Sequence, residues 1–313
     1  MTAASTPAIQ ADRLQKRYGR VEALAGLTMT VEPGEVFGFL GPNGAGKTTT
    51  VKLLLGLTRP SGGSAALLGQ PIGDLETRRR VGYLPELFRY QPWLRAREVL
   101  DLHADLIGFP RRERRTAIGD ALELVGLADR ANDPEGTFSN GMQQRLGLAV
   151  ALFGRPELVF LDEPSSALDP LGRIDVRAII RTIRERGAAV FLNSHLLTEV
   201  EQVCDRVAIV ARGRVVKEGL LNDVLGAPEV EVQVTGVDAE AMAAVATFGT
   251  PSYEGQRLRV AGMDLERVPD LVAALVGRGA RIHAVDAGRR SLEERFIDLV
   301  GAEGPPADPG AQS

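Results

Sequence analysis

The sequence predicts an α/β fold, with a mostly parallel sheet covered by helices, followed by a small α+β domain of the ferredoxin-like type. Three observations support this prediction. Apolar, β-branched runs such as Val36 to Leu40 alternate with amphipathic helical patterns, as in a sheet that is buried on both faces. A glycine-rich loop joins that run to a helical pattern. From about residue 228 the order becomes strand, helix, two strands, helix, strand and helix, which contains a βαββαβ unit.

The predicted domain boundaries follow these changes of pattern. Residues 7–227 form the first domain, and helical patterns at about residues 87–155 interrupt its strands, which indicates an inserted helical subdomain. Residues 228–301 form the small α+β domain. Residues 302–313 are rich in glycine, alanine and proline, and we expect them to form a disordered tail.

The composition excludes several classes of protein. Hydrophobic residues make up 44% and charged residues 25% of the 313 residues, as in a soluble globular protein. The formal net charge of −4 gives no electrostatic reason to expect nucleic acid as a partner. Cys204 is the only cysteine, so an intrachain disulfide and a cysteine-based metal cluster are excluded. The N-terminus lacks a secretory pattern and no apolar run approaches the ~20 residues that cross a bilayer, so we expect a cytoplasmic protein.

Residues 41–48, GPNGAGKT, match the G-x-x-x-x-G-K-[ST] motif of phosphate-binding loops and lie between a predicted strand and helix. Glycines permit backbone conformations in which successive N–H groups point at phosphate oxygens, and the helix adds its positive N-terminus. Lys47 reaches the β- and γ-phosphates, and the Thr48 hydroxyl can bind Mg²⁺. The predicted nucleotide-contacting residues here are Gly41, Pro42, Asn43, Gly44, Ala45, Gly46, Lys47, Thr48 and Thr49.

A second element, the acidic segment LVFLDE at residues 158–163, completes this pattern. Its apolar residues predict a buried strand, and Asp162 emerges at the carboxyl end, where ligands bind in open α/β sheets. We expect Asp162 to hold the Mg²⁺ shell and Glu163 to orient or deprotonate the attacking water. An acidic pair after a strand is often only a solvated strand end, but together with the phosphate loop it indicates a catalytic site.

Four further segments resemble one family in particular. Residues 138–145, FSNGMQQR, are similar to the signature LSGGQQQR of ABC proteins and precede LVFLDE, as that family requires. SALD at residues 166–169 resembles the D-loop, NSH ends in the switch histidine His195, and VGYLPE at residues 81–86 resembles the Q-loop. The resemblance covers about residues 7–225 and involves six motifs in the expected order. It implies a P-loop ATPase core with an inserted helical subdomain.

The resemblance also implies a composite site in a homodimer. Two such chains face each other head to tail and enclose two ATP molecules, so that Ser139 and Gly141 of one copy contact the γ-phosphate held by the other. It assigns the adenine ring to Tyr18 and the γ-phosphate to His195, with Lys47 as a further catalytic residue. Two plainer interpretations stay open: Tyr18 as an ordinary half-buried aromatic residue and His195 as a structural residue.

The chain departs from the family pattern at two motifs. Asn140 and Met142 replace the usual glycine and glutamine of the signature, while Ser139 and Gly141 are retained. Glu86 replaces the usual glutamine of the Q-loop, as in a branch that resembles drug and antibiotic exporters. By resemblance Glu86 lies near the nucleotide and Mg²⁺. The aromatic residues after it are expected either to meet a membrane partner or to form the core of the subdomain; they are Phe88, Tyr90 and Trp93.

The resemblance therefore implies an ATP-hydrolysing subunit that powers an ABC transporter, most simply an exporter, at the cytoplasmic face of the membrane through a separately encoded permease. An ABC importer stays open, as does a non-transport ABC ATPase of DNA repair, chromosome structure or translation. About ninety residues separate Thr48 from Ser139, which leaves no room for the long coiled-coil arms of the chromosome type. Translation factors of this kind usually carry two phosphate loops, and a small-molecule kinase has no reason to contain FSNGMQQR.

Overall fold

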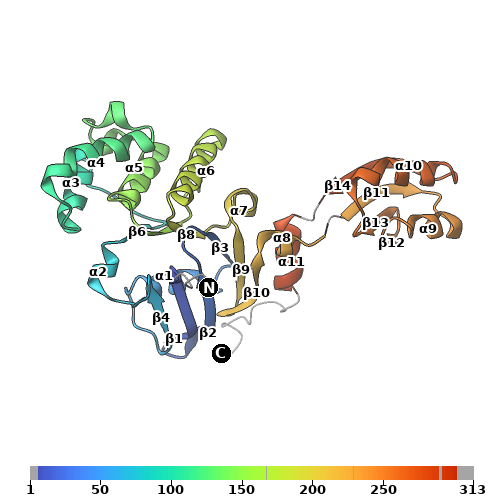
Figure 1. Ribbon diagram of the computed structural model, residues 1–313, viewed down its shortest axis with the longest axis horizontal. Helices are drawn as coiled ribbons and strands as arrows, with labels where there is room; N and C mark the ends of the chain where they lie inside the picture. The colour runs from blue at the N-terminus through green and yellow to red at the C-terminus, as the bar shows by residue number, and fades with distance from the viewer. Residues whose placement is uncertain (1–5, 167, 228, 289–290, 302–313) are drawn as a thin grey trace, which may run out of the picture. The chain divides into compact units, whose positions relative to one another are not determined.

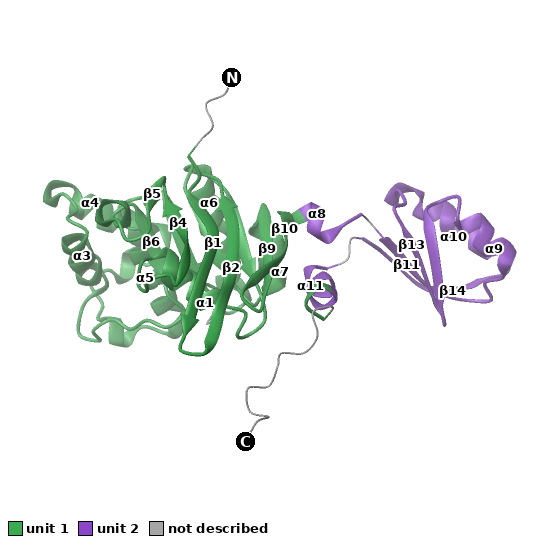
Figure 2. Ribbon diagram, turned by 90° about the horizontal axis from the view of Figure 1, so that it is seen from below, with its two compact units in different colours: residues 1–221, 299–313 green, residues 222–298 purple. Residues whose placement is uncertain are grey.

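The computed structural model describes residues 6–166, 168–227, 229–288 and 291–301. Two compact units make up the chain: unit 1 comprises residues 1–221 and 299–313, and unit 2 comprises residues 222–298 (Figure 2). The predicted tail, Ala167 of the D-loop and residue 228 at the predicted domain boundary lie outside the described residues. None of the helices in the described part of the chain combines the length and the apolar character that a membrane span requires.

A six-stranded sheet forms the centre of unit 1. Its strands are β3 (Val36–Leu40), β6 (Val81–Leu84), β7 (Leu158–Asp162), β8 (Ala189–Asn193), β9 (Arg206–Ala211) and β10 (Arg214–Leu220), in the order β10-β9-β3-β8-β7-β6. All neighbours pair in parallel except β10, which runs antiparallel to β9. Every residue of β3, β7 and β8 is buried, because these inner strands are covered on both faces. The predicted mostly parallel sheet is confirmed.

A smaller antiparallel sheet packs beside the first one. It contains β1 (Ile9–Tyr18), β2 (Val21–Val31), β4 (Gly62–Leu67) and β5 (Gln70–Pro71), in the order β2-β1-β4-β5. One hydrophobic core joins residues of both sheets with residues of the first helix. Its centre holds Phe39, Phe160 and Phe191, whose rings lie 5.1 and 5.2 Å apart across β8. Aromatic pairs at this distance pack favourably, and they support the strands that lead into the site.

Helices of unit 1 occupy the segments between these strands (Figure 1). The helical subdomain is confirmed: α3, α4 and α5 lie together beside β6 in both ribbon views. Short 3₁₀ turns at Ala128–Arg130 and Glu135–Thr137 connect α4 to α5. The helices are α1 (Lys47–Leu54), α2 (Leu75–Arg78), α3 (Ala96–Leu106), α4 (Arg111–Leu124), α5 (Asn140–Leu152), α6 (Pro170–Glu185) and α7 (Leu197–Val203).

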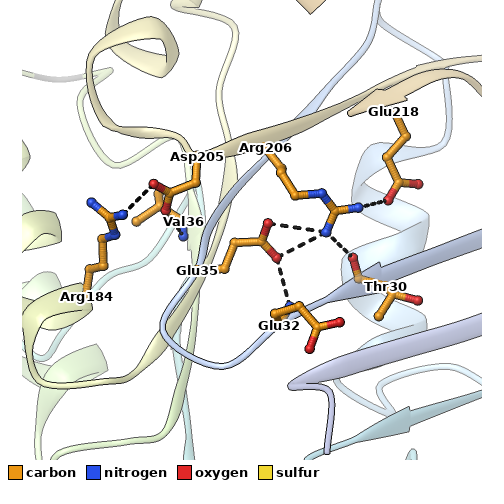
Figure 3. A network of polar contacts seen from close by, with 8 residues as sticks. All are labelled: Thr30, Glu32, Glu35, Val36, Arg184, Asp205, Arg206 and Glu218. Atoms are coloured by element: carbon orange, nitrogen blue, oxygen red, sulfur yellow. Dashed lines mark hydrogen bonds and ion pairs between the residues drawn. The ribbon is translucent and has the colours of Figure 1, made fainter. Parts of the chain in front are cut away.

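A polar network anchors the start of β3, the strand that leads into the glycine-rich loop (Figure 3). The guanidinium group of Arg206 donates to both carboxylate oxygens of Glu35, at 3.2 and 3.3 Å, and to Glu218 at 2.5 Å. Asp205 accepts the backbone N–H of Val36 at 2.9 Å. Burial raises the pKa of Glu218, while the charge of Arg206 opposes this effect. The network therefore joins β3 to β9 and β10 at the end remote from the loop.

Unit 2 has the predicted βαββαβ order. It contains β11 (Glu229–Thr235), α9 (Ala239–Val245), β12 (Thr250–Glu254), β13 (Arg257–Ala261), α10 (Val268–Val276) and β14 (Arg281–Gly288). The antiparallel sheet has the order β12-β13-β11-β14, which confirms the ferredoxin-like topology. Alternate residues of β11 enter a separate core with α9 and α10. Two flanking helices, α8 (Leu221–Leu225) and α11 (Leu292–Gly301), are joined by a hydrogen bond from Arg295 to the Leu225 carbonyl.

Candidate functional site

The loop between β3 and α1 requires its glycines. Gly44 and Gly46 have φ angles of +80° and +103°, which residues with a Cβ atom rarely adopt. A Cβ at Gly41 would lie 2.4 Å from the Val210 carbonyl oxygen, and one at Gly46 would lie 2.6 Å from the Ala23 carbonyl oxygen. The backbone of β2 and β9 therefore approaches the loop too closely for any larger residue.

The other predicted residues of the loop differ in their exposure to solvent. Ala45 is buried and donates its N–H to the Pro42 carbonyl at 3.1 Å, so it stabilises the turn. Asn43, Gly44 and Thr48 are exposed, and Thr49 is half-buried. Since α1 begins at Lys47 and its N-cap, Gly46, has no side chain, the first N–H groups of the helix lack a side-chain cap, as an anion-binding helix start requires.

Lys47 is held by its own loop. Its ammonium group donates to the carbonyl oxygens of Gly41 at 2.6 Å and Pro42 at 3.3 Å. Burial lowers the pKa of Lys47, whereas the carboxylates of Glu163, Asp162 and Glu86 raise it. These three acidic residues are 39 or more positions away from Lys47 in the chain, yet their charges act on its ammonium group.

Asp162 ends β7 and pairs with Asn193, the last residue of β8. Both side chains are only 3% exposed, and Nδ2 of Asn193 donates to Oδ1 of Asp162 at 2.5 Å. Burial raises the pKa of Asp162, while the hydrogen bond from Asn193 acts in the opposite direction. Sequence reasoning missed Asn193, although a polar residue that ends an otherwise apolar strand is a recognisable signal.

Glu163 and His195 lie together at the next position along the same edge. Glu163 has a φ of +53°, and its N–H donates to the Asn193 carbonyl at 2.8 Å, so β8 holds this rare backbone conformation. Its Oε1 accepts the backbone N–H of His195 at 2.9 Å. Its Oε2 lies 2.7 Å from Nδ1 of the imidazole, without the alignment of a hydrogen bond. The buried carboxylate thus orients a histidine whose side chain is 64% exposed.

The signature residues belong to a different part of unit 1. Ser139 caps α5, and its hydroxyl accepts the N–H of Met142 at 3.3 Å. Ser139 is exposed and Gly141 is half-buried, so both are open to a partner. Gln144, one turn further on, donates to the Pro164 carbonyl at 3.0 Å. This buried hydrogen bond connects α5 to the residue that follows Glu163.

Tyr18 ends β1 with 47% of its surface exposed. The ammonium group of Lys16 lies 4.9 Å from the centre of its ring, which is a cation–π distance. Glu86 follows β6 and is exposed, and its charge raises the pKa of both Asp162 and Tyr83. Tyr18 and Glu86 therefore both present polar or aromatic groups to the solvent.

The aromatic residues after Glu86 differ in their burial. A Cβ at Gly147 would lie 2.4 Å from the Phe88 ring, so Phe88 packs against the backbone of α5. Phe88 also contacts Tyr90, with ring centres 5.5 Å apart, and burial raises the pKa of Tyr90. Trp93 is 71% exposed. The first two belong to the subdomain core, and only Trp93 presents a large apolar surface outward.

The chain is similar to ABC transporter ATP-binding proteins in three comparisons. The family model for the ABC transporter domain matches residues 24–166. An uncharacterised ABC transporter ATP-binding protein of Synechocystis is 45% identical over 288 residues, which cover 91% of this chain and 80% of that protein. The bacitracin transport ATP-binding protein of Bacillus licheniformis is 34% identical, and the match covers 94% of this chain and 97% of that protein. The Nod factor export ATP-binding protein I of Burkholderia thailandensis is 37% identical, and the match covers 73% of this chain and 77% of that protein.

The structural comparison agrees with these matches. The structure of an ATP-binding subunit of an ABC transporter superposes with a TM-score of 0.65 and 31% sequence identity. The match covers 70% of this chain and 92% of the other.

Proposed function

The chain belongs to the family of ABC transporter ATP-binding proteins, and on this premise we propose that it powers an exporter through a separately encoded transmembrane permease. It is the ATP-binding subunit and an ATPase. The observation that supports its role best is the edge of the sheet where Asp162, Glu163 and His195 meet beside Lys47. Export is supported by the relative named for Nod factor export and by the Glu86 variant of the Q-loop.

The residues of this edge fit ATP together with Mg²⁺. Thr48, Asp162 and Glu86 offer hydroxyl and carboxylate oxygens, the donors that this hard cation prefers. Among the residues that the structure describes, no group of three or more His, Cys, Asp or Glu side chains forms a metal site. Mg²⁺ at a nucleotide site takes one or two carboxylates and completes its shell with phosphate and water oxygens. Bound Mg²⁺ supplies charge neutralisation at the β- and γ-phosphates.

Each residue of the proposed site has a distinct part in ATP binding or hydrolysis. Lys47 binds the β- and γ-phosphates with its ammonium group, and the loop N–H groups bind the remaining phosphate oxygens. Glu163 accepts a proton from the attacking water, and its contact with the His195 N–H keeps its carboxylate aimed. His195 is exposed enough to contact the γ-phosphate. Tyr18 stacks on adenine, as its open ring permits.

We also place the second half of each site on a second copy of the chain. Ser139 and Gly141 are exposed or half-exposed at the start of α5, where a helix of 13 residues presents free N–H groups to an anion. Nucleotide then joins two copies, and hydrolysis releases them.

Mixed dimers test this arrangement. Ser139→Ala and Lys47→Ala variants are each expected to lose most activity, while an equal mixture regains part of it, because a mixed dimer keeps one intact composite site. The measurement is ATPase activity against mixing ratio, with Ser64→Ala, at an exposed position of β4, mixed in the same way as a control for general effects of subunit exchange. If no mixture exceeds the sum of its separate proteins, the composite site is wrong for this chain.

Co-purification tests the membrane partner. We expect the tagged full-length chain, expressed with a membrane protein from a neighbouring gene, to retain that protein through detergent extraction. Trp93→Ala is expected to reduce the recovered membrane protein several-fold without changing basal ATPase activity, because it removes an exposed apolar contact. Val276→Ala, a similarly exposed residue of unit 2, serves as the matched control. Recovery of ribosomes or nucleic acid in place of a membrane protein would contradict the proposed function.

A further inference from the structure

Asn193 occupies a central position at the carboxyl edge of the sheet. Strand β8 lies between β3 and β7, and Asn193 pairs with Phe39 on one side and Asp162 on the other. The strand that leads to the phosphate loop and the strand that ends in Asp162 therefore flank it. Its side chain is buried and donates to Asp162.

The orientation of the Asn193 amide leaves one atom without a partner. An ionised carboxylate only accepts hydrogen bonds, so Asn193 must present its NH₂ group to Asp162 and turn Oδ1 elsewhere. Oδ1 is buried and has no hydrogen-bond partner among the described residues. Buried polar groups are almost always paired, so an orphaned acceptor at a candidate site points to a donor that arrives with the ligand.

The chemistry of the ligand limits what that donor is. Phosphate oxygens are acceptors and cannot pair with a carbonyl oxygen. Lys47, the lysine of the loop, donates to Gly41 and Pro42, and bound nucleotide draws its ammonium group to the phosphates. Mg²⁺ keeps several water molecules when it binds to nucleotides, and the hydrogens of those waters need acceptors. Residues that hold the ligands of a metal orient those ligands, and their loss typically lowers metal affinity about 10- to 100-fold.

We propose that Asn193 is a positioning residue for the metal: its Nδ2 holds Asp162, and its Oδ1 accepts a hydrogen bond from a water molecule in the Mg²⁺ shell. This proposal rests on the proposed nucleotide site and adds a residue to it. Asn193 acts through Asp162 and the metal-bound water and does not contact the reacting phosphate.

The test separates metal affinity from nucleotide affinity in the full-length chain. Asn193→Leu has a similar shape without polar atoms. We expect it to bind fluorescent ADP in EDTA within about twofold of the wild type, since Lys47 and the loop are unchanged. We expect the affinity of the ADP complex for Mn²⁺, a Mg²⁺ substitute visible by electron paramagnetic resonance, to fall by about 10- to 100-fold.

Two further variants make the comparison sharper. Asn193→Ser keeps a group that both donates and accepts, so it is expected to recover part of the Mn²⁺ affinity. Ser194→Ala is the matched control: Ser194 is equally buried and adjacent, but its hydroxyl accepts the Leu196 N–H. It is expected to leave Mn²⁺ affinity within about twofold. If Asn193→Leu does not fold, Asn193→Ala replaces it, and the Mn²⁺ affinities of Asn193→Ala and Asn193→Ser are compared.

The possible results have distinct meanings. Equal losses of ADP affinity with and without metal would overturn the proposal, because Asn193 would then act on Lys47 or the nucleotide directly. Unchanged Mn²⁺ affinity in Asn193→Leu would overturn it as well. Absence of nucleotide binding in the wild type would instead contradict the proposed function of the chain.

Discussion

Lys47→Ala is expected to abolish tight binding of MgATP. A hydrogen bond to a charged group contributes about 1.5–3 kcal/mol, and Lys47 reaches two phosphates, so the affinity should fall about 100-fold or more. The variant also removes the ammonium group that donates hydrogen bonds to the carbonyl oxygens of Gly41 and Pro42. A thermal unfolding measurement must therefore show that the variant is folded. Isothermal titration calorimetry with MgATP measures the affinity.

Lys52 provides the matched control for this experiment. It lies in the last turn of the same helix and is exposed. Lys52→Ala changes the net charge of unit 1 by the same amount, and we expect it to bind MgATP as the wild type does. A Lys47→Ala variant that binds MgATP with wild-type affinity would exclude the loop as the phosphate site.

Glu163→Gln is expected to bind ATP normally and to hydrolyse it about 10²- to 10⁴-fold more slowly, the usual range for the loss of a general base. The amide keeps an oxygen that accepts the His195 N–H, so the geometry of the edge is preserved. Because hydrolysis no longer separates the two copies, a dimer should accumulate in ATP. Size-exclusion chromatography with and without ATP detects this species.

The opposite end of the same strand supplies the control. Glu157 precedes β7 and forms an exposed ion pair with Arg80 at 2.6 Å. Such surface pairs contribute about 0–1 kcal/mol, so Glu157→Gln should hydrolyse ATP at nearly the wild-type rate. A Glu163→Gln protein that stays monomeric in ATP and hydrolyses at the wild-type rate would refute the catalytic assignment.

Several elements were missed by the sequence analysis for a common physical reason. β4 has the sequence GGSAAL, β10 has the sequence RVVKEGL, and β6 is only four residues long. β4 lies between β1 and the two-residue strand β5, and β6 and β10 lie at sheet edges. Such strands need no continuous apolar run, so their pattern is weak. The inner strands β3 and β7 are buried on both faces, and their apolar sequences predicted them correctly.

The aromatic residues after Glu86 show the same limit at single positions. Phe88, Tyr90 and Trp93 are alike in sequence, and both an interface and a subdomain core were open interpretations. The small residue Gly147 on α5 accommodates Phe88, and this contact spans 59 positions of the chain. Periodicity within a short window carries no information on such a contact.

The sequence by itself determined the family, the glycine-rich loop and the acidic strand end, because motif spacing and apolar runs are local properties. Only the tertiary structure decided which side chains meet. Asp162 pairs with Asn193 across 31 positions, and the Glu163 carboxylate accepts the His195 N–H across 32. These pairs exist because β7 and β8 are neighbours in a parallel sheet. That strand order results from burying both faces of the whole sheet, a property to which every strand contributes and which no single segment encodes.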